Sequence, residues 1–422
     1  MVIRTLILTL LSILSLHIHA AEAPHDTSTS IEDPAFHTLR VMVNDQEFTP
    51  PVIYLNSDDR LNISFDELSD DLRYMRYELL HCTADWRIDN LIPAEYLDGF
   101  NEAPITDYSY SQATLTHYIH YSLTIPNEDM RPTISGNYLL RIYDENDPER
   151  TLLQVRFCIV EPTMKVKASV TSRTDIDYNE SHQQLSVSVD PDGTYIANPY
   201  TDISVRVEQN SRCDNAVSVT GPTSMEGTLL KFDHDRRLIF PAGNEFRRME
   251  VVSTTYPGMG VESISFADPY YHFDLYPDSP RLDSPYTYDQ TQFGGFKIRE
   301  YNSTDSDVEA DYVIVHFSLM MPWQDSFDIF IDGDLTHHRF DPQSRMVFNR
   351  ATNRYESAML LKQGAYNYQY LAVPAGSMTG LTAPIEGDKY QTANRYLVKV
   401  YQRRPGERYD RLTAVTMATS GI

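Results

Sequence analysis

The sequence predicts an all-β protein made of three consecutive immunoglobulin-like β-sandwich domains. Apolar and polar residues alternate with period two along most of the chain, for example in Leu185–Val189 and Tyr396–Tyr401. This alternation places one face of a strand in a core and the other face in water. Turn-forming residues such as Pro191–Gly193 separate the alternating runs, and no long helical pattern interrupts them. Many short strands joined by regular turns are typical of β-sandwiches.

The first residues predict a cleaved secretory signal peptide, which we place at residues 1–23. Arg4 supplies a positive charge, an apolar run extends from Leu6 to Leu16, and small residues follow at Ala20 to Ala23. The apolar run is too short to span a bilayer as a helix. No cysteine precedes Cys82, so we do not expect a lipid anchor. We expect no integral membrane segment in the mature chain, because it has no run of about 18 uncharged apolar residues.

Charge and cysteine content exclude further classes of protein. The chain has 35 Lys and Arg residues against 60 Asp and Glu residues, a net charge of -25, which disfavours nucleic acid as a partner. Its three cysteines are too few, and odd in number, for a disulfide framework. Cys82 and Cys158 fall in the same predicted domain and could pair, while buried free thiols on strands are the alternative. The cysteines show no metal-ligand spacing.

Two breaks in the strand pattern set the domain boundaries. The run Val155–Glu161 has the pattern of a last strand and leads into Pro162, so the N-terminal β-sandwich is expected at 36–162. The segment Tyr270–Tyr288 is rich in Pro, Asp and Tyr, as in an extended connector. The middle β-sandwich with this connector is therefore expected at 163–290, and the C-terminal sandwich at 291–422.

The C-terminal domain has a pattern of its own. Phe327–Asp334 followed by Tyr355–Tyr370 looks like an early-set sandwich of the carbohydrate-binding kind, a likeness of architecture. Gly364 stands before the strand Ala365–Tyr370, where a tight turn would favour a positive φ. This domain is therefore predicted to be early-set-like.

The residues with chemical potential do not assemble into an enzyme site. His81 and Cys82 are adjacent on a strand and should point to opposite faces, one into the core and one outward. His337 and His338 are expected in a solvent-exposed loop. Trp86 is expected to be a core or boundary aromatic, with an exposed anchor for a partner as the alternative. No nucleophile, phosphate-binding or metalloprotease motif is present, so we predict a protein that is not an enzyme and has no cofactor and no metal.

Long strings along the chain resemble the plug protein family of the type IX secretion system. The strings lie in all three predicted domains: Pro50–Leu68, Tyr77–Trp86, Ile92–Tyr108, His120–Tyr143, Ile196–Ala216, Phe240–Met249 and Gly387–Leu412. They extend over nearly the whole mature chain and are far more specific than a short motif. The family usually has a large residue near position 213, where this chain has Cys213.

The resemblance implies a non-enzymatic plug for a very large outer-membrane β-barrel. Such a plug binds the periplasmic end of the translocon barrel and seals its pore while no substrate is in transit. The expected location is the periplasm, peripheral to the inner face of the outer membrane, and we expect a monomer when the chain is free. The acidic surface could meet basic loops at the barrel mouth, and a removable plug favours a polar interface.

Two segments, near Leu97–Tyr108 and Phe240–Arg248, break the strand alternation while keeping aromatic and Arg side chains. Ordinary loop packing is the competing interpretation of both. The candidate partner-binding residues that they supply are Tyr96, Phe100, Asn101, Asn244, Phe246 and Arg247.

Two other functions compete with the plug. A carbohydrate-binding protein would explain the early-set pattern and the many tyrosines, but a sugar site needs exposed aromatics in one platform. The tyrosines here alternate along strands instead. A surface scaffold or adhesin stalk would carry a lipid anchor or a sorting domain, and we expect neither.

Overall fold

The computed structural model describes residues 26–421, and nearly all regular structure in them is β-strand. The fold is thus all-β, with multiple antiparallel sheets, as predicted. The short helical elements are α1 (Pro93–Tyr96), α2 (Pro199–Asp202), α3 (Ser306–Glu309), η1 (Arg236–Leu238) and η2 (Asp334–Thr336). No helix within residues 26–421 has the length and apolarity to cross a membrane. The predicted signal peptide, residues 1–23, lies outside the described part.

A first unit is formed by residues 30–160 around one large apolar core. One sheet has the order β1-β12-β11-β5-β7, with β3 parallel to β12, and the facing sheet has the order β2-β4-β9-β8. A separate ribbon joins β6 to β10. The strands are β1 (Ser30–Ile31), β2 (Phe36–Val43), β3 (Val52–Tyr54), β4 (Leu61–Glu67), β5 (Met75–Cys82), β6 (Leu97–Gly99), β7 (Ala103–Pro104), β8 (Asp107–Tyr110), β9 (Ile119–Ile125), β10 (Met130–Pro132), β11 (Gly136–Asp144) and β12 (Asp147–Val160).

A middle unit combines residues 165–241 with the last two strands of the chain. One sheet has the order β13-β14-β18-β17, with β19 also on β14, and the other has the order β16-β15-β29-β30. Valines and other aliphatic side chains of both sheets share one core. The strands are β13 (Lys165–Thr171), β14 (His182–Asp190), β15 (Ile203–Gln209), β16 (Val217–Thr220), β17 (Ser224–Glu226), β18 (Leu229–Phe232), β19 (Ile239–Pro241), β29 (Arg395–Gln402) and β30 (Arg411–Thr419).

A third unit lies between these two parts of the middle unit in sequence, at residues 247–374. Strand β28 pairs with β20, β23 and β25, and the facing sheet has the order β21-β22-β24-β27-β26. Their side chains form a third large core. The strands are β20 (Arg247–Glu250), β21 (Val261–Ala267), β22 (Tyr270–Leu275), β23 (Phe296–Ile298), β24 (Tyr312–Leu319), β25 (Phe327–Asp332), β26 (Val347–Asn349), β27 (Arg354–Lys362) and β28 (Gly364–Pro374).

The pairing of strands departs from the expected domain boundaries. Strand β29 pairs with β15 from Ile203↔Gln402 to Gln209↔Tyr396, so the C-terminal segment completes the middle unit. Tyr270, expected to open the connector, instead begins strand β22. Sequence alternation identifies strands but not their partners, which is why a boundary at residue 290 cuts through the third core.

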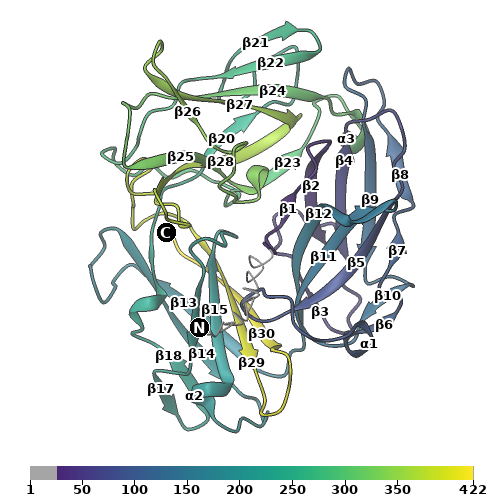
Figure 1. Cartoon of the computed structure of the whole chain (residues 1–422). Helices are drawn as coiled ribbons and strands as arrows, with labels where there is room; N and C mark the ends of the chain where they lie inside the picture. Colours follow the sequence, from purple (N-terminus) through teal and green to yellow (C-terminus); the bar gives the residue numbers. More distant parts are fainter. Residues whose placement is uncertain (1–25, 422) are drawn as a thin grey trace, which may run out of the picture.

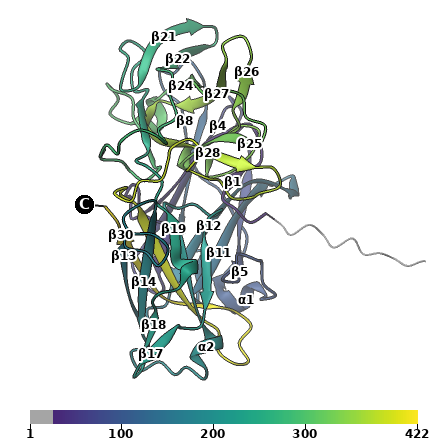
Figure 2. The ribbon, with the colours of Figure 1, turned by 90° about the vertical axis from the view of Figure 1, so that its left-hand side faces the viewer.

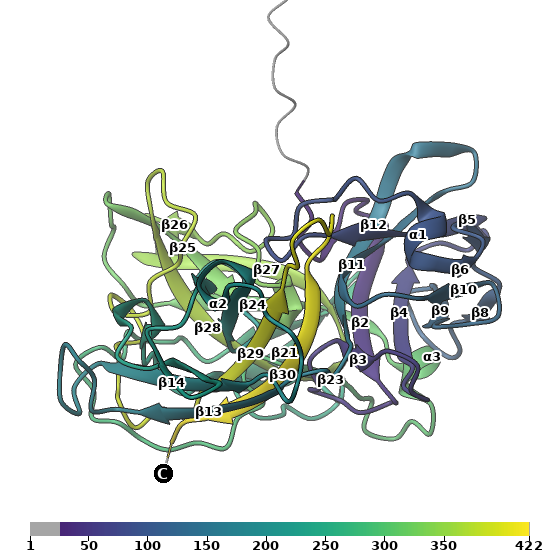
Figure 3. The same cartoon turned by 90° about the horizontal axis from the view of Figure 1, so that it is seen from below.

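The three units surround a common centre. In Figure 1 the third unit lies at the top, the middle unit at the lower left and the first unit at the right. Figure 2 shows the third unit above the middle unit, with β4 and β8 of the first unit at the level of the third. Seen from below, the yellow strands β29 and β30 run beside the first unit (Figure 3), where β30 contacts β11 and β12. Each unit therefore contacts the other two.

Gly364 has a different role from the expected one. Its φ is not positive, and a Cβ at this position would lie 2.5 Å from the backbone carbonyl oxygen of Lys297. Strand β23 approaches β28 at Gly364↔Ile298, so the glycine permits close approach of two backbones rather than a turn.

Candidate functional site

The first three predicted contact residues lie on one loop of the first unit. Tyr96 is buried, and its hydroxyl donates to the carbonyl oxygen of Leu79 at 2.8 Å. The side-chain oxygen of Asn101 accepts from the Leu79 N–H at 3.0 Å. These two residues fasten the loop to strand β5. Phe100, between them, is 75% exposed, so it is the one residue of the three that the loop presents to solvent.

The other three predicted contact residues lie inside the protein. Asn244 and Phe246 are buried, and only 9% of the Arg247 side chain is exposed. They belong to the segment that leaves strand β19 of the middle unit and enters strand β20 of the third unit. The structure brings Asn244, Phe246 and Arg247 together at this junction, far in sequence from Tyr96, Phe100 and Asn101.

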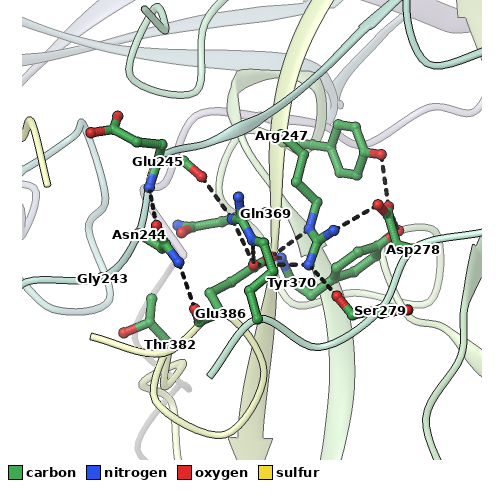
Figure 4. A network of polar contacts seen from close by, with 12 residues as sticks. Gly243, Asn244, Glu245, Arg247, Asp278, Ser279, Gln369, Tyr370, Thr382 and Glu386 are labelled. Atoms are coloured by element: carbon green, nitrogen blue, oxygen red, sulfur yellow. Dashed lines mark hydrogen bonds and ion pairs between the residues drawn. The ribbon is translucent and has the colours of Figure 1, made fainter. Parts of the chain in front are cut away.

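A buried carboxylate, Glu386, organises the junction between the middle and third units (Figure 4). Arg247 donates to both of its oxygens at 3.0 Å, and Arg281 donates to one at 2.7 Å. The Tyr370 N–H also donates to Glu386, at 2.9 Å. Burial raises the pKa of Glu386, but Arg247 and Arg281 outweigh it and hold this pKa below its ordinary value. Glu386 is therefore an ionised carboxylate inside the protein.

The same arginine reaches a second carboxylate. Arg247 donates to Asp278 at 2.6 Å, and Asp278 accepts from the hydroxyls of Tyr368 and Tyr370 at 2.9 and 2.8 Å. Burial opposes the charge of Arg247, but Glu386 and Asp278 together raise its pKa. The network connects the segment before β20, the connector after β22 and the segment between β28 and β29 (Figure 4).

A second buried network joins the first unit to the third. Asp66 of β4 and Lys362 of β27 form an ion pair at 2.5 Å, with both side chains almost fully buried. Asp66 also accepts from the Tyr312 hydroxyl at 2.7 Å and contacts His120 at 2.6 Å. Burial raises the pKa of Asp66, but Lys362 and His120 outweigh it and lower this pKa. The Lys362 ammonium lies 4.0 Å from the centre of the Tyr118 ring.

A third buried network joins the first unit to the middle unit. Lys399 of β29 pairs with Glu208 of β15 at 2.7 Å, and the Tyr401 hydroxyl donates to Asn137 of β11 at 2.7 Å. A small apolar cluster surrounds them: Cys82, Trp86, Leu139, Cys158, Val160, Tyr401 and Leu412. Of the charged residues at these three junctions, the sequence had pointed to Arg247 alone. The clearest local signal is at Lys399, a charge in the middle of a strand with the apolar Leu397 and Tyr401 on the same side.

Two sequence expectations are wrong in the same way. His81 and Cys82 lie in opposite directions, yet both are buried, because the middle unit covers the face of β5 that was expected to be in water. His338 is not in a solvent-exposed loop. Its side chain is nearly buried, and its two ring nitrogens contact Asp332 and Asp334 at 2.9 and 3.0 Å.

The cysteines follow the alternative of free thiols. All three are free, with Cys82 and Cys158 buried and Cys213 exposed. Asn137 of β11 pairs with Cys158 on one side and with Cys82 on the other. Two strand spacings of about 4.8 Å therefore separate the two cysteines, beyond the reach of about 7 Å for a disulfide.

The two tryptophans differ in exposure. Trp86 is buried at the junction of the first and middle units. Trp323 is 63% exposed and stacks on the buried Tyr355 with 6.4 Å between ring centres.

Within residues 26–421, no group of three or more His, Cys, Asp or Glu side chains could hold a metal ion. The charged groups at the three junctions contact one another, so the geometry defines a class of all-β protein whose units meet at buried polar networks.

Comparison with known proteins gives the family. The family described as Type 9 secretion system plug protein 1st domain matches residues 36–161. A hypothetical protein from Parabacteroides merdae, known from its crystal structure, is 42% identical, with a TM-score of 0.92 over 93% of this chain and 99% of that one. The chain belongs to the type 9 secretion system plug protein family.

Other comparisons add nothing to this assignment. The Pseudomonas fluorescens alkylpurine DNA glycosylase AlkC, in a complex with DNA, is 15% identical over 29% of each chain, and its TM-score of 0.19 carries no argument. No curated protein matches the chain.

Proposed function

We propose that this protein closes the pore of the type 9 outer-membrane translocon by binding the periplasmic end of the barrel while no substrate is in transit. Family membership supports the plug role. A barrel wide enough to pass folded proteins leaves an aqueous hole that needs a bulky stopper. We infer that the three units are β-sandwich domains, each made of two sheets around one core, and that their combined bulk forms the stopper.

The observation that carries this proposal is the buried polar network at each of the three junctions: Lys362–Asp66 is an ion pair between two units, while Arg247–Glu386 and Lys399–Glu208 lie buried beside the other two junctions. A stopper must keep its shape when a substrate protein pushes against it. Moving the first unit away from the third would separate Lys362 from Asp66, and a buried pair that is broken in this way costs several kcal/mol. Because each unit contacts the other two, a unit cannot move away without breaking two junctions.

A removable plug also needs a surface that binds without becoming permanent. The net charge of -25 favours a polar contact with basic groups at the barrel mouth. Phe100 is the exposed member of the predicted contact set, held in place by Tyr96 and Asn101. We propose that Phe100 is an apolar anchor within this polar contact, while Asn244, Phe246 and Arg247 act indirectly by keeping the units in register.

The protein is proposed to act as a binding protein without catalysis. Its carboxylates and arginines at the junctions are held by one another, and none faces a reactive nucleophile. A carbohydrate-binding function would need several exposed aromatics in one platform. Trp323 is exposed, but the rings against which it packs, Phe348 and Tyr355, are half-buried and buried. The early-set likeness of the third unit stays a prediction.

Affinity purification from detergent-solubilised outer membranes tests the proposal, with the chain tagged at its C-terminus. The translocon barrel should co-purify, and the yield should be highest from cells that lack secreted substrate. Phe100→Ser should lower the yield about tenfold, as expected for loss of an interface anchor. Tyr195→Ser is the matched control, because Tyr195 is equally exposed at 78% but lies on the middle unit. Recovery of the chain without the barrel would refute the plug function, and recovery with glycan would favour the carbohydrate-binding alternative.

A further inference from the structure

A cavity of about 220 Å³ lies where the three units meet. All three contribute to its wall, including Trp86 and Arg156 from the first unit, Arg395 and Lys399 from the middle unit, and Phe296 from the third. Its volume is somewhat below the range of about 300 to 1,000 Å³ that is usual for ligand pockets. The cavity is thus large enough for a small organic molecule, and it has no role in the plug function proposed above.

The charge of the cavity wall is opposite to that of the protein. Six Lys and Arg side chains line it, against three carboxylates, although the whole chain has a net charge of -25. Four of the six have an acidic partner, as Lys399 has in Glu208. Within residues 26–421, no carboxylate pairs with Arg156 or Arg395. The cavity therefore holds two arginines that form no direct ion pair with the described residues, although Asp26 acts on Arg156 and Asp334 acts on Arg395 at longer range.

Both unpaired arginines are held in place by neutral groups. Arg156 donates to the carbonyl oxygen of Thr27 at 2.7 Å and lies 4.6 Å from the centre of the Trp86 ring. Arg395 donates to the carbonyl oxygen of Phe48 and lies over the Phe293 ring at 5.2 Å. Burial lowers the pKa of Arg395. A guanidinium that is partly removed from water without a counter-ion is a strong attractor for an anion.

Trp86 lies in the same wall. Its side chain is 6% exposed, and its indole N–H has no hydrogen-bond partner among the described residues. Leaving a buried donor unpaired costs about 1 to 3 kcal/mol. The Trp86 backbone has a φ of 63°, an unusual conformation for a bulky side chain that indicates a specific local requirement. This N–H is closed off from the cavity, so Trp86 contributes the surface of its ring to the wall.

We propose that the cavity binds a small carboxylate with an apolar body. The carboxylate pairs with Arg395, because a planar guanidinium fits a carboxylate well, and Arg156 adds positive charge to the same wall. The apolar part of the ligand contacts the hydrophobic wall, which includes Phe157, Phe296 and Leu397. The ligand is a free organic acid or the carboxyl end of a peptide, since both present the same chemistry. Because the wall comes from all three units, the bound acid also stabilises their arrangement.

Fluorescence of Trp86 reports binding directly. The chain has two tryptophans, so Trp323→Phe leaves Trp86 as the one indole. In this background, 3-phenylpropionate should produce a saturable change in emission, while 3-phenylpropanamide, which has no charge, should bind about tenfold more weakly or not at all. Gly-Gly-Phe with a free carboxylate, compared with its C-terminal amide, tests the peptide source. Stronger binding of the peptide acid than of 3-phenylpropionate assigns the ligand to a chain end, and the reverse assigns it to a free acid.

A variant series tests whether the arginines are responsible. Arg395→Met should weaken binding of 3-phenylpropionate about tenfold or more, whereas Arg236→Met, at an exposed position outside the cavity wall, should leave it unchanged. If Arg395→Met does not fold, the comparison of acid with amide on the parent protein decides alone. Equal binding of acid and amide, or no saturable change with either acid up to about 10 mM, would overturn the proposal.

Discussion

Replacing Glu386 by glutamine should destabilise the whole protein. The substitution keeps the size of the side chain but removes the charge that Arg247 and Arg281 share. Breaking a buried ion pair by removing one partner costs about 3 to 5 kcal/mol. Arg247 keeps Asp278 at 2.6 Å, and 26% of the Arg281 side chain is exposed, so part of the lost interaction is replaced. We therefore expect the free energy of unfolding to fall by about 3 kcal/mol.

A surface ion pair in the same unit provides the control. Arg345 and Asp328 are also 2.6 Å apart, but their side chains are 52% and 53% exposed. Asp328→Asn should lower the free energy of unfolding by less than about 1 kcal/mol, because water and salt screen exposed pairs. The two substitutions change the same number of charges, so the difference between them measures the effect of burial.

Equilibrium unfolding in urea measures both variants. Fluorescence of Trp86 follows the junction of the first and middle units, and that of Trp323 follows the third unit. Separate Trp323→Phe and Trp86→Phe backgrounds distinguish the two signals, and coinciding transitions justify a single free energy. If Glu386→Gln lowers the free energy of unfolding by no more than Asp328→Asn does, the buried charges do not hold the units together.

Three further predictions follow from the other buried groups. Lys362→Met should lower the free energy of unfolding by about 3 to 5 kcal/mol, because Asp66 stays buried without its cation. In a double-mutant cycle with Asp66→Asn, strictly additive changes in the free energy of unfolding would contradict this coupling. Burial lowers the pKa of His337 to about 4, so proton NMR should show His337 gaining its proton only in acid. His338 should keep its proton above the ordinary histidine pKa near 6.5, because Asp332 and Asp334 outweigh the opposing effect of burial. His337 therefore contributes stability above pH 6.5 that is lost as the pH falls toward 4. His338 contributes stability below pH 6.5 that is lost as the pH rises through its raised pKa. Titration of both histidines near pH 6.5 would contradict these environments. A thiol reagent should modify Cys213 alone in the native protein and all three cysteines in concentrated guanidinium chloride, and rapid native modification of a second cysteine would contradict the burial.

Strand positions were predictable because alternation reflects a local property of the chain. Ile203, Val205 and Val207 of β15 are fully buried, while Ser204 and Arg206 between them are half-buried. The partners of the strands were not predictable, because alternation does not encode which strand lies alongside. Strand β29 pairs with β15 after the whole third unit has intervened, and nothing local to either sequence selects the other.

The junctions escaped sequence analysis for a related reason. Lys362, Lys399 and Asp66 occupy polar positions in alternating strands, where a solvated face is the ordinary interpretation. They are buried because another unit covers that face. A weak signal exists in β29, where Leu397 and Tyr401 lie on the same side as Lys399 and make both faces partly apolar, as in a strand that is covered on both sides.

The predicted contact residues do not all lie at the surface. Most side chains of Phe240–Arg248 pack inside the protein, whereas most of those of Leu97–Tyr108 are exposed. Arg247 interrupts the alternation because it must reach two carboxylates on other segments, Glu386 and Asp278. Phe100, held outward by its neighbours, keeps the exposure that a partner contact requires. Its role in binding stays a prediction.

Ionic current through the reconstituted translocon tests the central proposal most directly. The purified barrel is placed in a planar bilayer, and the chain is added first to one side and then, in a separate experiment, to the other. The account predicts that the current falls sharply when the chain is added from the periplasmic side and stays unchanged when it is added from the opposite side. An open pore at saturating chain, or equal block from both sides, would contradict a plug that seals the periplasmic end of the barrel.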